Sequence, residues 1–109
     1  MINSISRFSP RMGIMAPPPG SLDGMTRNIA TRAINGNKLS AASADDLTMI
    51  RQAFTQSTRP PAVFNVTPAG LMGAKYEACA VGNQVFVRVT PVVPNAKGSW
   101  FQAGSLPVF

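Results

Sequence analysis

The 109-residue sequence predicts an α+β domain, with two N-terminal helices packed on a small antiparallel sheet and a disordered N-terminal tail. Three observations predict it. Apolar residues recur every three or four positions up to Phe54, which is the period of a helix. From Val85 to Val89 they recur at every second position, which is the period of a strand. Before Ser21 no period is found.

The first 20 residues contain Pro10 and a proline triplet at positions 17–19. Proline is excluded from the interior of helices and central strands, and a proline triplet favours an extended polyproline conformation. We therefore expect residues 1–20 to form a disordered tail that could serve as a secretion signal. Residues 21–109 are then a single small domain with a modest core.

The first helix is expected to begin after Ser21, whose hydroxyl is a good N-cap. An Asn-Gly-Asn sequence at positions 35–37 is typical of a left-handed stop. Between the two signals, apolar residues follow at helical spacing: Leu22, Met25, Ile29 and Ala33.

The second helix is expected in the segment SAASADDLTMIRQAF. Ser43 and Asp46 have the spacing of a capping box, and Asp45 places a second acid in the first turn. Arg-Pro-Pro at positions 59–61 is expected to end this helix. The side chains that predict its apolar face are Leu47, Ile50 and Phe54.

Strand patterns follow in the second half of the chain. Residues 62–66 are rich in strand-forming side chains and predict a strand that ends before Pro68. Residues 71–81 are a weaker candidate for a strand. Gly82-Asn83 is typical of a two-residue hairpin turn. Residues 97–109 are expected to form a loop and a short terminal strand.

The segment QVFVRVTPVV at positions 84–93 alternates most clearly. Val85, Val87 and Val89 should point to one side of the sheet, and Phe86, Arg88 and Thr90 to the other. Its prolines at 91 and 94 restrict its end to a sheet edge or an exit. With both helices placed on one face of the sheet, the predicted core is Leu47, Ile50, Phe54, Phe64, Val85, Val87, Val89 and Trp100.

Composition excludes several classes of site. The chain has ten Lys and Arg, four Asp and Glu, a net charge of +6, no histidine and one cysteine. An intramolecular disulfide, a His/Cys zinc site and Ser-His or Cys-His catalysis are therefore impossible. The basic residues are scattered, which argues against nucleic acid as the partner. The sequence contains no run of about 18 apolar residues, so we expect no membrane-spanning helix. We also expect no classical signal peptide.

No catalytic residue can be assigned from the sequence, so enzymatic activity is the less favoured class. Asp45 and Asp46 are explained by capping, and Glu77 is expected to face solvent or pair with Lys75. Cys79 has apolar neighbours and is expected to be a buried, inert thiol. We expect no metal site and no cofactor.

One short motif, at positions 59–71, indicates a different function. Arg59, Pro60, Pro61 and Phe64, followed by Gly-Leu at positions 70–71, resemble the NAD-binding region of bacterial ADP-ribosyltransferase toxins. The resemblance implies that Arg59 binds NAD as the cofactor, and a guanidinium suits a phosphate. Those toxins also need a late catalytic glutamate, whereas no acid follows Glu77 in this sequence. The resemblance therefore implies a degenerate relative.

The first 22 residues contain no acid, and Ile2 and Ile5 lie near the start. In this they resemble the export signals of type III secreted effectors of plant-pathogenic bacteria, which are serine-rich and unfolded. The serines that carry the resemblance are Ser4, Ser6, Ser9 and Ser21. A mitochondrial presequence is the nearest competitor, but the prolines oppose the amphipathic helix it requires. An ordinary disordered arm is the other alternative.

Three functional hypotheses follow. The first is a small secreted bacterial effector, a virulence protein that binds a host protein inside the host cell, with a dedicated secretion chaperone as a possible second partner. The second is the NAD-binding protein or pseudo-enzyme that uses Arg59. The third is a structural component of a phage or secretion apparatus, with the tail as an assembly arm.

Overall fold

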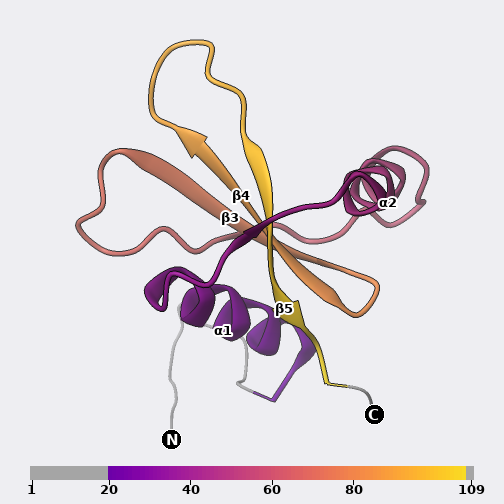
Figure 1. Ribbon diagram of the computed structural model, residues 1–109. Coiled ribbons are helices and arrows are strands. Elements are labelled where there is room, and N and C mark those ends of the chain that lie inside the picture. Colours follow the sequence, from indigo (N-terminus) through magenta and orange to yellow (C-terminus); the bar gives the residue numbers. More distant parts are fainter. Residues whose placement is uncertain (1–19, 108–109) are drawn as a thin grey trace, which may run out of the picture.

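The computed structural model describes residues 20–107 (Figure 1). Residues 1–19 of the expected tail lie outside this range. Within residues 20–107, five strands form one antiparallel sheet in the order β1-β5-β4-β3-β2, so the predicted α+β class is confirmed. No helix within residues 20–107 is long and apolar enough to cross a membrane. The elements are α1 (Leu22–Asn35), β1 (Ser40–Ala41), α2 (Ala44–Thr55), β2 (Phe64–Asn65), β3 (Ala74–Val81), β4 (Gln84–Pro91) and β5 (Ser99–Ser105).

Both ends of α1 are set by the predicted residues. The Ser21 hydroxyl accepts a hydrogen bond from the Gly24 N–H at 3.0 Å, as an N-cap does. At the other end Asn37 adopts a left-handed conformation with φ of 54°. The next N–H, that of Lys38, then donates to the Ala33 carbonyl at 2.8 Å, which closes the last turn.

Helix α2 begins as predicted and ends earlier. The Ser43 hydroxyl and the Asp46 carboxylate each accept the other residue's backbone N–H at 3.1 Å, which is a complete capping box. The prediction that positions 59–61 end the helix is wrong, because α2 stops at Thr55. The Ser57 hydroxyl instead accepts the Arg59 N–H at 3.1 Å, so this backbone turns before the prolines are reached.

Strands β3 and β4 form the predicted hairpin. Val81 pairs with Gln84, and Gly82 has φ of 62°, a conformation that favours glycine in a two-residue turn. Strand β4 is the middle strand of the sheet, so Pro91 lies where the chain leaves the sheet and not on an edge strand.

Strand β5 is longer than expected. The predicted terminal strand is present, but it is not short, since β5 has seven residues and pairs with β4 on one side and β1 on the other. Its register shifts by one residue near Gly104, and this bulge lets the strand continue to Ser105. The two-residue strand β1 was not predicted.

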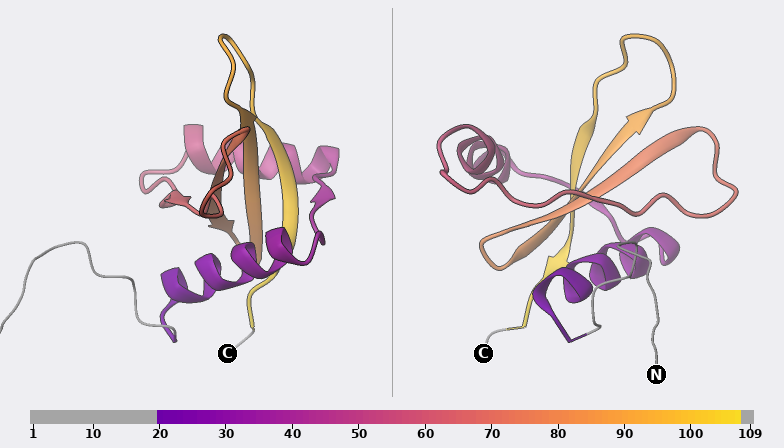
Figure 2. Two further views of the ribbon diagram at one scale, coloured as in Figure 1. Left: turned by 90° about the vertical axis from the view of Figure 1, so that its left-hand side faces the viewer. Right: turned by 180° about the vertical axis from the view of Figure 1, so that it is seen from behind.

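The two helices pack on opposite faces of the sheet, so the prediction that they share one face is wrong (Figure 2). The cause is that β4 is apolar on both sides. Val85 and Val87 lie in one hydrophobic cluster, together with Ala30 of α1. Phe86 points the other way and lies in a second cluster with Ile50 of α2.

Most of the predicted core side chains are at least partly buried, and one is not. Ile50, Val85 and Val87 are fully buried. Leu47 is 43% exposed, because α2 turns another stripe of residues toward Phe86. The remaining predicted residues are partly buried against the two clusters: Phe54, Phe64, Val89 and Trp100.

The stability of the fold should depend far more on Phe86 than on Leu47. Phe86 is 0% exposed, so Phe86→Ala should lower the free energy of unfolding by about 3–5 kcal/mol through lost burial and a cavity. The control, Leu47→Ala, should cost less than about 1 kcal/mol. Urea denaturation of the two variants measures the difference, and equal costs would contradict the burial of β4 on both faces.

Candidate functional site

A groove lies between α1 and the segment that begins in β2, and we name it the α1–β2 groove. Its volume is about 500 Å³. Helix α1 contributes Arg27, Thr31 and Asn35, which lie four residues apart and therefore on one side of the helix. Ile34 completes this wall. The opposite wall is the segment 65–69.

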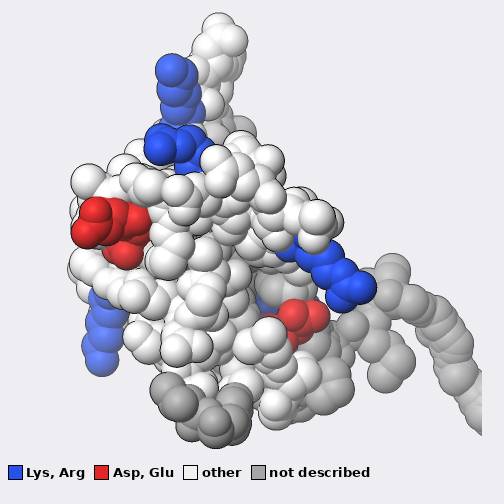
Figure 3. All heavy atoms as spheres, turned by 90° about the vertical axis from the view of Figure 1, so that its right-hand side faces the viewer, with Lys and Arg blue, Asp and Glu red and all other residues white. Residues whose placement is uncertain are grey.

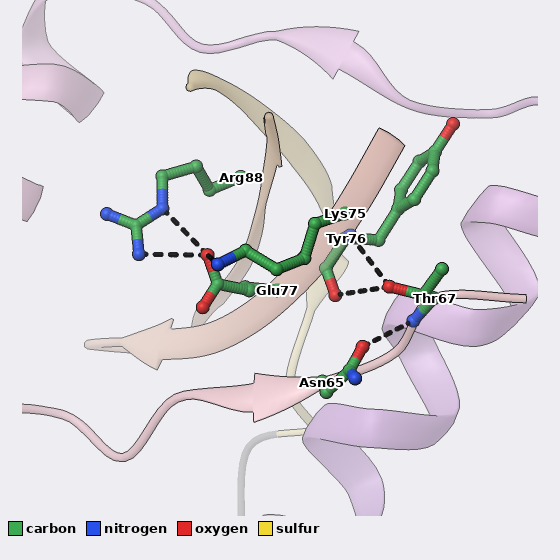
Figure 4. Close-up of polar contacts among 6 residues, drawn as sticks. All are labelled: Asn65, Thr67, Lys75, Tyr76, Glu77 and Arg88. Atoms are coloured by element: carbon green, nitrogen blue, oxygen red, sulfur yellow. Dashed lines mark hydrogen bonds and ion pairs between the residues drawn. The ribbon is translucent and has the colours of Figure 1, made fainter. Parts of the chain in front are cut away.

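Local hydrogen bonds shape this opposite wall (Figure 4). The side-chain oxygen of Asn65 accepts the Thr67 N–H at 3.0 Å. The Thr67 hydroxyl accepts the Tyr76 N–H at 2.9 Å and so takes the place of a backbone partner in the strand ladder. These side-chain bonds end β2 after two residues and direct the chain away from the sheet at Pro68.

Strand β2 is an edge of the sheet, and no strand within residues 20–107 pairs with its other side. The Val66 N–H donates to the Tyr76 carbonyl at 2.9 Å, toward β3. Because inward and outward groups alternate along an antiparallel strand, the N–H and C=O of Asn65 point away from β3. The groove therefore borders a backbone donor and acceptor that another extended chain can pair with.

Arg27 is the charged group of the groove. Its guanidinium carbon lies 6.0 Å from the centroid of the Phe64 ring, at the outer limit of a cation–π contact. Among residues 20–107 the ion pairs involve only Glu77, so Arg27 has no carboxylate partner there. None of the acids in the described part of the chain lines the groove. A cation beside hydroxyl and amide groups is suited to an anionic group such as a carboxylate.

A second polar cluster is explained by structure alone. The Glu77 carboxylate accepts hydrogen bonds from Nε and Nη2 of Arg88 at 3.2 and 3.0 Å (Figure 4), while Nζ of Lys75 lies 3.9 Å away. The guanidinium carbon of Arg88 is 5.3 Å from the centroid of the Trp100 ring. Glu77 therefore pairs mainly with Arg88, the residue opposite it on β4. Sequence reasoning missed this pair because it depends on the register between β3 and β4.

Arg59, the residue predicted to bind NAD, lies in the turn after α2. Its side chain is exposed, and its backbone N–H and C=O are both bonded to the Ser57 hydroxyl. It does not line the α1–β2 groove. NAD binding through Arg59 stays a prediction. The residues that do line the groove were not predicted, since no sequence signal brings α1 beside β2.

Charge and metal-binding groups are dispersed. Figure 3 shows the Lys and Arg side chains of one face in separate places and not as one continuous stripe. Asp23, Asp45 and Asp46 lie in the first turns of the two helices, where acids stabilise the helix dipole. Within residues 20–107 no three His, Cys, Asp or Glu side chains come together in a way that could hold a metal ion.

Cys79 is buried, as predicted, and it lies in the cluster on the α2 side of the sheet. Burial raises the pKa of its thiol from 9.0 to about 11, because the thiolate would lose its hydration, and the nearby charge of Arg88 lowers it only in part. A thiol in this state is a poor nucleophile at neutral pH.

Comparison with known proteins gives no relative for the chain. No protein-family model matches it, and no curated protein or solved structure is significantly similar to it.

The state of Cys79 predicts both its reactivity and a pH dependence. At pH 8, iodoacetamide should modify the native protein about a hundredfold more slowly than the unfolded chain, because the thiolate fraction is that much smaller. The pKa of the thiol is higher in the folded protein than in the unfolded chain, so the unfolded chain loses its proton first as the pH rises. The free energy of unfolding should therefore be unaffected by this thiol below pH 9.0 and should fall between pH 9.0 and about 11.

Thermal melts across this range measure the pH effect, with Cys79→Ala as the control that lacks the titrating thiol. The difference in melting temperature between wild type and variant should shrink as the pH rises. Rapid alkylation of the native protein would contradict the burial of Cys79.

Proposed function

We propose that the protein is an interaction protein that binds an acidic, extended segment of another protein in the α1–β2 groove. The observation that carries this proposal is Arg27, a partly buried cation that has no carboxylate partner within residues 20–107 and faces a groove without acids. A bound carboxylate would accept charge-assisted hydrogen bonds from its guanidinium.

An extended peptide fits the groove better than a small molecule does. The outward N–H and C=O of Asn65 can pair with a peptide backbone, which is how a strand adds to a sheet edge. Thr31 and Asn35 can donate hydrogen bonds from the helix side. Since β2 is only two residues long, few backbone bonds can form, and the acidic side chain must supply much of the affinity.

The proposed setting is a host cell, where the protein acts as a secreted effector and the partner is a host protein. The support is the acid-free, serine-containing N-terminal sequence. The single cysteine adds to it, because a domain without disulfides can be unfolded for passage through a narrow channel. A dedicated secretion chaperone would be a second partner.

The groove should select acidic peptides. In a fluorescence anisotropy titration with acidic and with neutral peptides of the same length, the acidic ones should bind more tightly. Arg27→Ala should weaken that binding by about tenfold or more. The matched control is Arg32→Ala, which removes the same charge from an exposed position on α1 outside the groove.

NMR titration locates the bound peptide. The largest chemical-shift changes should fall on the backbone amides of Asn65 and Thr67. Equal loss of affinity in both arginine variants, or shifts confined to another face, would contradict the groove as the binding site.

Export should depend on the first 20 residues. A translocation reporter fused after residue 50 should leave the producing bacterium only when its type III system is intact. A fusion that carries residues 21–50 alone is the control and should be retained. Retention of the full leader fusion would contradict the effector proposal and leave the groove proposal standing.

A further inference from the structure

Four exposed apolar side chains gather where β3 begins and β4 ends, and we name this region the apolar end. Met72 is 87% exposed, Val92 64% and Val93 61%, and Leu71 is the fourth member. A pair between Ala74 and Pro91 closes the ladder at this end. The Val92 N–H then donates to the Gly73 carbonyl at 3.2 Å, which holds the two loops side by side.

The apolar end lies among basic residues. Lys75 follows it at the start of β3, and Lys97 lies in the loop that leads to β5, both with exposed side chains. The nearest acid along the strand, Glu77, is shared between Arg88 and Lys75, whose side-chain nitrogens lie 3.0 and 3.9 Å from its carboxylate, so one acid faces two cations. Among the other acids, Asp23 lies in α1, and Asp45 and Asp46 lie in α2. The apolar end therefore has a surplus of positive charge.

We propose that the apolar end docks on the surface of an anionic lipid bilayer. Met72, Val92 and Val93 would enter the boundary between headgroups and acyl chains, while Lys75 and Lys97 stay among the lipid phosphates. Binding of this kind needs apolar side chains that reach into the boundary together with cations that attract the headgroups. The net charge of +6 adds a general attraction to such a surface.

The position of these side chains favours a bilayer over a protein partner. They stand on loops that project from the end of the sheet, and the loop after β4 points away from α1 (Figure 1). A bilayer accepts projecting side chains without a matching shape, whereas a protein partner would need complementary pockets. The inference does not depend on the α1–β2 groove, which lies beside α1.

Co-sedimentation with lipid vesicles tests the proposal on the full chain. The protein should bind phosphatidylcholine vesicles that contain phosphatidylserine, and bind pure phosphatidylcholine vesicles far less. The double variant Met72→Ser/Val93→Ser leaves the charge unchanged and should lower partitioning by about tenfold or more. The matched control is Leu22→Ser, which removes an apolar side chain of 57% exposure at the start of α1 and should have no effect.

The contribution of charge is tested separately. Lys75→Gln/Lys97→Gln should weaken binding to the phosphatidylserine vesicles and reduce its salt dependence, more than Arg32→Gln with Lys38→Gln does. Both control cations are exposed residues near the end of α1.

Three outcomes would overturn the proposal. The first is that the wild-type protein does not bind the anionic vesicles. The second is that Met72→Ser/Val93→Ser binds as well as Leu22→Ser does. The third is a concentration-dependent dimer in analytical ultracentrifugation that Met72→Ser/Val93→Ser abolishes, since the apolar end would then be a contact between copies of this chain. Because these side chains are exposed, the variants should keep the wild-type melting temperature.

Discussion

The burial of β4 on both faces is the constraint from which the rest of the architecture follows. Val85, Phe86 and Val87 are consecutive, all three are 0% exposed, and their side chains alternate between the two faces of the sheet. One helix cannot cover both faces. Helix α1 therefore lies over the valines and α2 over Phe86, and the short chain has one helix for each face.

This arrangement also creates the candidate site. One helix lies on each face of the sheet, and its two edge strands, β1 and β2, are only two residues long. Such short edge strands limit unwanted strand pairing between molecules. The bonds of Thr67 to Tyr76 turn the chain out of the sheet beside α1. The α1–β2 groove is the space left where the helix and the departing chain diverge, and Arg27 lies in its wall.

Sequence could predict what is decided locally. The caps at Ser21 and Ser43 and the turn at Gly82 each depend on hydrogen bonds or dihedral angles within a few residues. It could not predict which face α2 covers or that β5 joins two strands, because these depend on distant residues. The exposure of Leu47 shows the limit, since helical spacing gives a stripe but not its direction. The groove depends on the same long-range placement and left no local signal.

The distribution of the acids connects the fold with the proposed functions. Three of the four acids lie in first turns of helices and the fourth, Glu77, is paired with Arg88, so each carboxylate has a structural role. The cations outnumber them, and among residues 20–107 six cations are left without ion pairs: Arg27, Arg32, Lys38, Arg51, Arg59 and Lys97. Such a surface has unpaired cations that can bind anionic groups, whereas its acids are already engaged within the fold. The two surfaces proposed here, one for an acidic peptide and one for anionic lipid, differ in shape and in apolar content but both depend on this imbalance. Raising the salt concentration should therefore weaken both, whereas only the bilayer contact should respond to the loss of Met72.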